Sequence, residues 1–490
     1  MTDAAGPGAA AVTHVDVAVV GAGLSGIGAA CRLRRDLPEV SVAVLEARDR
    51  LGGTWDLFRY PGVRSDSDMF TMGYAFEPWT DPVSVADGAS ILAYLQRTAQ
   101  RYGVDRLVRF GHRVRRAAWS SQDARWTVSV DTDSGPATLT CDFLLLCSGY
   151  YRYGEGFTPD WPGLADFAGT VVHPQHWPAD LDVTGREVVV VGSGATAVTL
   201  VPALARTAAH VTMLQRSPTH LTPLPARDPV AEATLQVLPS GVAYPLLRWK
   251  NVLASQAFYV LSRRRPALVR RLLRRAQQPL LPSDFDYSHL TPHYEPWDQR
   301  LCVVRDGDLF AAVRAERASF VTDTIERFEP GGIRLGTGSL LPADVVVTAT
   351  GFTLAPMGGV RLVVDDRPVV LPDHHVYKGS MLDGVPNMAF VIGYTNASWT
   401  LKADLVDAFV VRLLRHLRRH GYRSVVARPP AEPGAGSPII DLAAGYVQRS
   451  RDELPLQGAH YPWRLRQSYP ADVLALRLGR LRDGVLAFAH

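Results

Sequence analysis

At 490 residues the chain is too long for one compact core, so two domains, or one domain inserted in another, are expected. A composition of 47% hydrophobic and 20% charged residues excludes a largely disordered or fibrous chain. The formal net charge of +4 is small for this length. Nucleic acid is therefore not an expected partner. The binding of anionic cofactors is sufficient to explain the small excess of basic residues.

The cysteines predict the redox compartment. Cys31, Cys141, Cys147 and Cys302 show neither C-x-x-C nor metal-type spacing, and no secretory signal opens the chain. We expect reduced thiols in a cytoplasmic protein without a metal site. Residues 1–14 are rich in Ala and Gly and are predicted to form a flexible tail. No apolar stretch reaches the roughly 18 residues needed to span a bilayer.

The first motif follows an apolar strand in DVAVVGAGLSGIGAACRLRRDLPEVSVAVLEARD. Gly21, Gly23 and Gly26 form G-x-G-x-x-G between strand and helix, where backbone N–H groups can meet a pyrophosphate. Glu46 ends the next strand and is expected to accept hydrogen bonds from ribose hydroxyls, and Ser25 lies close enough to contact phosphate. A turn without function is disfavoured because strand, helix, second strand and acid stand in the required order.

A second unit, EVVVVGSGATAVTLVPALARTAAHVTMLQRS, carries G-x-G-x-x-A at Gly192, Gly194 and Ala197. Its last strand ends in Arg216 and Ser217, where the first unit has an acid. A guanidinium can bind a 2′-phosphate bidentately, whereas a carboxylate would repel it, so the second cofactor is predicted to be NADPH. The same site is expected to include Ser193, Ala195, Thr196 and Val198.

Two further strands end in glycine, at Gly149 and Gly351, and are interpreted as crossings between domains. The predicted fold is α/β, with a Rossmann-like FAD domain, an inserted NADPH domain and a helical insertion. The expected ranges are 15–150 plus 350–490 for the FAD domain, 151–349 for the NADPH-binding domain, and about 226–300 for the insertion. The stretch RPPAEPGAGSP is predicted to be a loop, after which the chain wraps back over the first domain.

Two dinucleotide sites restrict the class, because one nucleotide must feed hydride to the other, which must be a flavin. Disulfide reductases, flavin reductases and oxygenases all use that arrangement. Disulfide reductases need a redox-active cysteine pair beside the flavin. The nearest pair, Cys141 and Cys147, lies across a strand of buried character, so the sequence argues against a disulfide reductase.

Phe167, Gly169, His173, Trp177 and Pro178 form the pattern F-x-G-x-x-x-H-x-x-x-W-P. This pattern resembles the fingerprint of type I Baeyer–Villiger monooxygenases. Related flavin-containing and N-hydroxylating monooxygenases generally lack its Trp-Pro ending. The resemblance implies that the fingerprint histidine acts through domain linkage and cofactor positioning. Aromatic packing between domains is the alternative role for His173 and Trp177.

A second family motif, GGTWDLFRYPGVRSDSD, agrees with the fingerprint. Further stretches such as YEPWDQRLCVV and VIGYTNASWTLKADL resemble mycobacterial FAD-containing monooxygenases, from about residue 15 to near the C-terminus. Apolar and aromatic residues from Gly393 to Trp399 are expected beside the flavin, with ordinary core packing as their alternative role. The resemblance places further cofactor contacts at Thr54, Trp55, Asp56, Leu57, Arg64, Ser65, Asp66 and Val114.

The resemblance also implies the chemistry. NADPH reduces FAD, O2 adds to give a C4a-peroxyflavin, and this reagent converts ketones to esters or lactones and can S-oxygenate sulfides and thioamides. Such a reaction needs a permanently charged donor in a dry pocket, for which Arg64 and Arg300 are candidates. The resemblance assigns this role to Arg300, with Asp66 orienting and partly neutralising it. Simple pairing of Arg300 with Asp298 is the competing interpretation.

Two other functions remain open from the sequence, namely a heteroatom monooxygenase that makes N- or S-oxides and a flavin-containing sensor that does not turn over. A separate hypothesis concerns the segment WKNVLASQAFYVLSRRRPALVRRLLRRAQQ, which contains seven arginines and one lysine among apolar residues. It predicts either peripheral contact with the inner face of a membrane or a solvated arginine face on helices packed against the NADPH domain.

Overall fold

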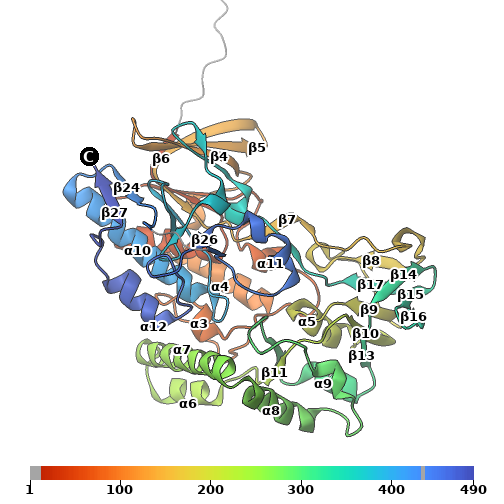
Figure 1. The fold of residues 1–490 in the computed structure, drawn as a ribbon. Helices are drawn as coiled ribbons and strands as arrows, with labels where there is room; N and C mark the ends of the chain where they lie inside the picture. The colour runs from red at the N-terminus through yellow and green to blue at the C-terminus, as the bar shows by residue number, and fades with distance from the viewer. Residues whose placement is uncertain (1–12, 432–435) are drawn as a thin grey trace, which may run out of the picture.

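The computed structural model describes residues 13–431 and 436–490 (Figure 1). Most of the expected tail, residues 1–14, therefore lies outside the described residues. Its last two residues were assigned wrongly, because Thr13 and His14 begin the first strand, where they pair with Leu139 and Thr140. Parallel pairing with a long neighbouring strand extends this strand beyond its apolar part.

The first sheet has nine strands and carries the first glycine motif. Its parallel part brings together β3, β2, β1 and β6, with β23 also paired to β6, and an antiparallel part continues through β5 and β4 to the edge strands β19 (Arg361–Val364) and β20 (Arg367–Pro368). The helices α1 and α10 pack on it and share its larger core (Figure 1). The bounds are β1 Thr13–Val20, β2 Val42–Leu45, β3 Val108–Arg109, β4 Arg113–Ser120, β5 Arg125–Thr132, β6 Gly135–Leu146, β23 Met388–Phe390, α1 Leu24–Asp36 and α10 Trp399–His420.

The second sheet is entirely parallel, in the order β13, β10, β9, β17, β8. Its central strands are valine-rich and buried, as expected for a parallel sheet covered on both faces. The bounds are β8 Thr170–Val172, β9 Glu187–Val191, β10 His210–Gln215, β13 Ala318–Thr322 and β17 Val345–Thr348, with α5 Ala195–Leu204 and α9 Asp308–Arg314 beside them.

Two short strands connect the sheets. The chain leaves the first sheet after β6 through β7 (Tyr151–Gly156) and returns after β17 through β18 (Phe352–Leu354). These strands pair with each other, antiparallel. β18 begins directly after Gly351 and β7 two residues after Gly149, where the sequence predicted the crossings. The exact domain limits stay a prediction.

The expected helical insertion consists of α6 (Pro229–Val237), α7 (Ser240–Arg264) and α8 (Pro266–Gln277). By chain position these helices belong with the second sheet, and the sequence placed them against it. In space, α6 and α7 instead bury Ala231 and Tyr244 in the core of the first sheet. These helices pack where their apolar faces can be buried, and the core of the first sheet offers the apolar surface for this. Their position in the chain is therefore a poor guide to their position in space.

After the loop near residue 430, part of which lies outside the described residues, the chain returns to the first sheet as predicted. Ile439, Leu442 and Val447 are buried in the second core of that sheet. All four cysteines are free and buried, and burial raises the pKa of the Cys31 and Cys141 thiols to about 12. Within the described ranges, no helix is long and apolar enough to cross a membrane.

A buried ion pair fixes α7 to the first sheet. The Nη2 of Arg248 on α7 donates to Asp404 Oδ2 on α10 at 2.8 Å, and both side chains are buried. The Nη1 of Arg248 donates to the backbone carbonyls of Phe70 and Gly73 at 3.0 and 2.6 Å. The guanidinium thus bridges three chain segments, and its side chain is almost fully buried.

We expect Asp404→Ala to lower the free energy of unfolding by about 3 to 5 kcal/mol, because it leaves the Arg248 charge buried and uncompensated. Urea unfolding followed by tryptophan fluorescence measures the change. Arg263→Ala is the matched control, since its pair with Asp298 is about half exposed and is worth roughly 0 to 1 kcal/mol. Equal losses in the two variants would contradict the argument.

Candidate active site

One large cavity, of about 1570 Å³, opens at the carboxyl ends of β1 and β9. It is lined from both glycine motifs, from the crossing strands and from the C-terminal segment. Most of the predicted site residues meet there, although they are scattered along the chain. They are Gly21, Gly23, Ser25, Glu46, Thr54, Trp55, Arg64, Ser65, Asp66, Val114, Gly192, Ser193, Gly194, Ala195, Thr196, Arg216, Ser217 and Arg300.

Five predicted cofactor contacts do not line this cavity: Gly26, Asp56, Leu57, Ala197 and Val198. A Cβ at Gly26 would lie 1.8 Å from the carbonyl oxygen of Gly21, so this glycine permits close packing of helix on strand. The Asp56 carboxylate is held by Arg48 and Arg59 beneath the cavity wall. Leu57, Ala197 and Val198 pack in the core of the second sheet. These five residues support the wall of the cavity without lining it.

Two helices point uncapped N-termini at the cavity. Gly23 precedes α1 and Gly194 precedes α5, and neither helix has a side-chain cap. A Cβ built at Gly194 meets no atom within 4 Å, so the space before α5 is open. Helix N-termini of this kind attract phosphate through free N–H groups and the helix dipole. The donor set therefore fits two pyrophosphates.

The strand ends beside these helices differ in charge. Glu46 lines the cavity and accepts hydrogen bonds from the backbone N–H groups of Ala22 and Arg48, at 2.8 and 2.9 Å. These bonds hold its carboxylate beside the α1 turn, within reach of a ribose. At the end of β10, Arg216 is exposed to the cavity and forms no ion pair with any described residue, while the Ser193 hydroxyl donates to the Ser217 carbonyl. The second site thus keeps a guanidinium available for an anion.

His173 lies where the two crossings meet. Its Nδ1 accepts the Gln175 N–H at 3.1 Å, so its Nε2 carries the proton and faces the Gly351 carbonyl at 3.3 Å. Desolvation lowers the pKa of His173, in agreement with a neutral ring. A Cβ at Gly156 would lie 1.9 Å from the ring. Trp177 does not line the cavity and packs against the second-sheet core. These contacts connect the two crossings, while the role of His173 in positioning a cofactor stays a prediction.

The two candidate arginines have different partners. Arg64 is buried in an ion pair with Asp308, with one N–O distance of 3.2 Å. Arg300 is exposed to the cavity and donates from Nη2 to the Tyr394 carbonyl at 3.0 Å. Pairing of Arg300 with Asp298 is wrong, because Asp298 binds Arg263 at 2.6 Å. The Arg300 guanidinium therefore retains donors for a ligand in the cavity.

Asp66 projects into the same cavity. Desolvation by the surrounding walls raises the pKa of its carboxyl to about 6, although the positive charges of Arg300 and Arg64 act in the opposite direction. The predicted direct orientation of Arg300 by Asp66 is not seen, since the described residues include no ion pair between the two. Asp66 acts on Arg300 through its charge, while the Tyr394 carbonyl orients the guanidinium.

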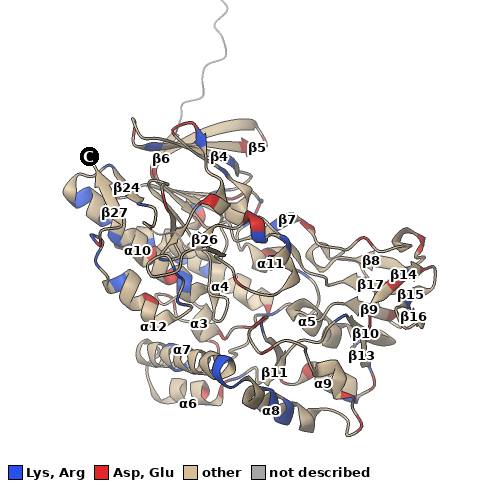
Figure 2. Ribbon diagram, in the orientation of Figure 1, with Lys and Arg blue, Asp and Glu red and all other residues tan. Residues whose placement is uncertain are grey.

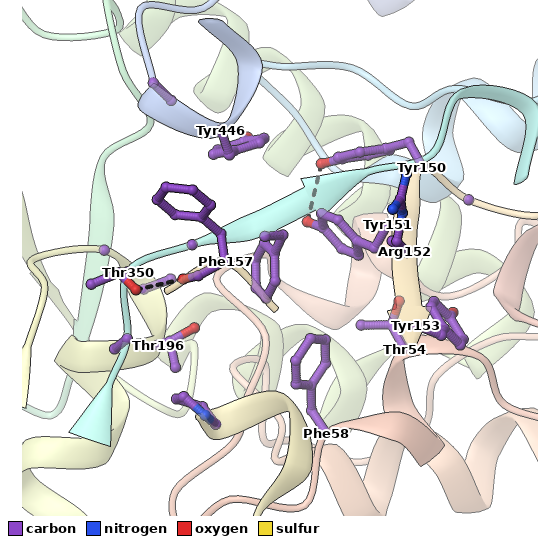
Figure 3. A pocket seen from close by; sticks show the side chains of 18 of the residues that line it. Thr54, Phe58, Tyr150, Tyr151, Arg152, Tyr153, Phe157, Thr196, Thr350 and Tyr446 are labelled. Atoms are coloured by element: carbon purple, nitrogen blue, oxygen red, sulfur yellow. Dashed lines mark hydrogen bonds between the residues drawn. The ribbon is translucent and has the colours of Figure 1, made fainter. Parts of the chain in front are cut away.

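An aromatic wall faces Arg300, in which Trp399 belongs to the stretch expected beside the flavin, whereas the sequence analysis missed the tyrosines. Tyr150 and Tyr151 share a hydroxyl contact of 3.1 Å at the start of β7, as Figure 3 shows, and Tyr446 lines the same cavity. Trp399 stacks on Tyr150 at 5.3 Å and donates to the Ser25 hydroxyl at 2.7 Å. Desolvation raises the pKa of Tyr151 to about 12, so it stays a neutral donor. The run YYRY after a strand-ending glycine was the available signal.

Both sheets, both helix N-termini and the shared cavity define a flavoprotein that binds two dinucleotides. A family model described as pyridine nucleotide-disulphide oxidoreductase matches residues 15–238. The FAD-containing monooxygenase EthA of Mycobacterium tuberculosis is 51% identical over 97% of this chain and 98% of its own. The probable FAD-binding monooxygenase AlmA of Acinetobacter baylyi is 44% identical, over 97% of this chain and 96% of its own.

Two solved structures have the same fold. An oxidised steroid monooxygenase bound to NADP matches with a TM-score of 0.74 and 25% identity, covering 98% of this chain and 100% of that one. An open structure of cyclohexanone monooxygenase matches with a TM-score of 0.73 and 19% identity, with the same coverage, and supports the fold alone. The chain belongs to the family of FAD-containing monooxygenases, and its cofactors are FAD and NADPH.

We expect Arg216→Ala to remove most of a preference for NADPH over NADH. A bidentate charged contact is worth roughly 1.5 to 3 kcal/mol, or about ten- to hundredfold in affinity. Steady-state kcat/KM for the two coenzymes measures the preference. Arg186→Ala is the control, because Arg186 is exposed and does not line the cavity. Equal kcat/KM values for the two coenzymes in the unaltered protein would refute the assignment.

Proposed function

We propose that this protein is a Baeyer–Villiger monooxygenase that inserts one oxygen atom of O2 into ketones to give esters or lactones, and that it also S-oxygenates sulfides and thioamides. The observation that carries the proposal is the Arg300 guanidinium, which lines an aromatic-walled cavity and, among the described residues, donates to one neutral backbone carbonyl. When bound, FAD supplies the oxygen-transfer chemistry and NADPH supplies the hydride.

The chain's own residues divide into binding and reaction roles. We assign the FAD pyrophosphate to the α1 N-terminus and its ribose to Glu46, and the NADPH pyrophosphate to the α5 N-terminus. Arg216 and Ser217 hold the 2′-phosphate. Further cofactor contacts come from Ser25, Thr54, Trp55, Arg64, Ser65, Val114, Ser193, Ala195 and Thr196, which line the same cavity.

Arg300 stabilises the negative charge that develops on oxygen during the reaction. A preorganised charged donor in a cavity with little water is the arrangement that lowers the energy of such charge most effectively. Asp66, when ionised, offsets part of the excess positive charge, and Tyr150, Tyr151 and Tyr446 exclude water from the reacting groups. Arg300 and Asp66 are thus the proposed reaction pair, coupled by charge.

A product analysis separates the proposal from its nearest alternative. The enzyme is given NADPH with either an aliphatic methyl ketone or an aryl methyl sulfide, and mass spectrometry identifies the products. We expect ester from the ketone in addition to sulfoxide from the sulfide. Sulfoxide without ester would identify a heteroatom monooxygenase. NADPH consumption unaffected by either compound would instead point to a protein that binds the cofactors without substrate turnover.

We expect Arg300→Ala to bind FAD and oxidise NADPH while forming hydrogen peroxide in place of ester. Loss of a preorganised donor costs about 2.7 to 4 kcal/mol, roughly a hundred- to a thousandfold in the oxygenation step. The ratio of ester to NADPH consumed measures the effect. Arg263→Ala is a control, since its pair with Asp298 is partly exposed. Near-normal ester formation in Arg300→Ala would show that Arg300 is not the residue that stabilises the negative charge, and Arg64 would become the candidate for this role.

A further inference from the structure

The longest helix of the insertion is apolar on both sides. Tyr244, Leu247 and Val252 on the inner side of α7 are buried in the first-sheet core. The outer side exposes Val242 (53%), Leu246 (55%), Trp249 (42%) and Leu253 (55%). These four residues are spaced by three or four positions and form one stripe along the helix. A helix that is apolar all round normally lies inside a protein or a membrane.

The stripe continues onto neighbouring segments. Val230 and Val237 of α6 are 56% and 79% exposed, and the π-helical turn Val473–Leu478 exposes Leu474 (63%) and Leu478 (71%). Trp249 contacts Tyr469, which leads into that turn, with ring centroids 5.5 Å apart. Single exposed apolar residues are ordinary, whereas a contiguous group marks an interaction surface. We call this group, from α6, α7 and the 473–478 turn, the apolar face.

Positive charge lies beside the apolar face. Residues 229–278 contain nine basic residues and one acid, Glu232. In Figure 2, α7 is tan along most of its length, and blue appears where it ends and along α8. On α8, Arg270 pairs with Glu295 and Arg274 lies over Tyr287, but Arg271 and Arg275 have no acidic partner in the described chain. They flank the exposed Leu268 and Leu272.

We propose that the apolar face and the α8 arginines form a docking surface for an anionic phospholipid bilayer. Leucine, valine and tryptophan side chains would enter the interface between headgroups and acyl chains, while arginines bind phosphate groups. A second copy of the chain is a poorer occupant. In a two-fold contact the same patch meets itself, which would bring two sets of unpaired arginines together. The inference does not depend on the reaction proposed above.

The test uses the FAD-loaded enzyme and flotation with vesicles of phosphatidylcholine, with or without phosphatidylglycerol, at low and high salt. We expect binding to the anionic vesicles at low salt, weakened by high salt and by removal of phosphatidylglycerol. The double variant Leu246→Ser/Leu253→Ser should lower the partition coefficient about tenfold or more, because it removes apolar area that would enter the bilayer. Arg271→Gln/Arg275→Gln should lower it by about tenfold.

Matched controls carry the same changes elsewhere. Leu340→Ser/Val370→Ser alters two exposed apolar residues away from this face, and Arg186→Gln/Arg206→Gln alters two exposed arginines. Both controls should bind vesicles as the unaltered protein does, and all four variants should retain FAD absorbance and NADPH oxidation. Sedimentation velocity on the same samples reports self-association.

Two results would overturn the proposal. One is the absence of flotation with anionic vesicles at low salt, whether the protein is monomeric or self-associates through the apolar face. The other is unchanged vesicle binding by both test variants, which would place the lipid contact on another surface. Binding lost equally in test and control variants would have the same meaning, since net charge or general hydrophobicity would then account for it.

Discussion

The structure depends on bringing two uncapped helix N-termini to one cavity. Each N-terminus offers backbone N–H groups and a positive dipole end that no side-chain cap satisfies, so both are free to receive the negative charge of a bound phosphate. Gly26 and Gly192 make this possible through close backbone approach. A Cβ at Gly26 would lie 1.8 Å from the Gly21 carbonyl, and one at Gly192 would lie 2.3 Å from that of Ala349.

That arrangement requires the two sheets to keep a fixed relation, and in the described chain two short crossings connect them while α7 packs from the insertion onto the first sheet. The antiparallel pair β7 and β18 supplies one contact between the crossings, and the His173 ring supplies another by packing on Gly156 and facing the Gly351 carbonyl. A neutral histidine suits this position, because a charged ring would need a counter-ion in the connection. The fingerprint residue therefore lies in the wall of the cavity and holds its geometry there.

Local patterns in the sequence predict both dinucleotide units, because each motif lies within about 30 residues and its glycines have a direct backbone cause. The contacts that finish the site join distant positions. Trp399 donates to Ser25, Tyr446 faces Tyr150, and Arg300 is oriented by the carbonyl of Tyr394. Every residue has a backbone carbonyl, so the amino-acid sequence does not reveal which carbonyl accepts this hydrogen bond. Packing of α7 on the first sheet escaped prediction for a related reason, since both sheets could accept an apolar helix.

The partners of the two cavity arginines also bear on which of them can move during turnover. Arg64 is buried with Asp308, and breaking such a pair costs about 3 to 5 kcal/mol. Arg300 gives up one hydrogen bond to a neutral carbonyl, a loss of roughly 1.5 to 3 kcal/mol that new contacts to an anionic group would offset. In the proposed reaction, a side chain that turns toward developing negative charge needs the smaller barrier. The same cavity thus holds one arginine that fixes its wall and another that is able to change partners.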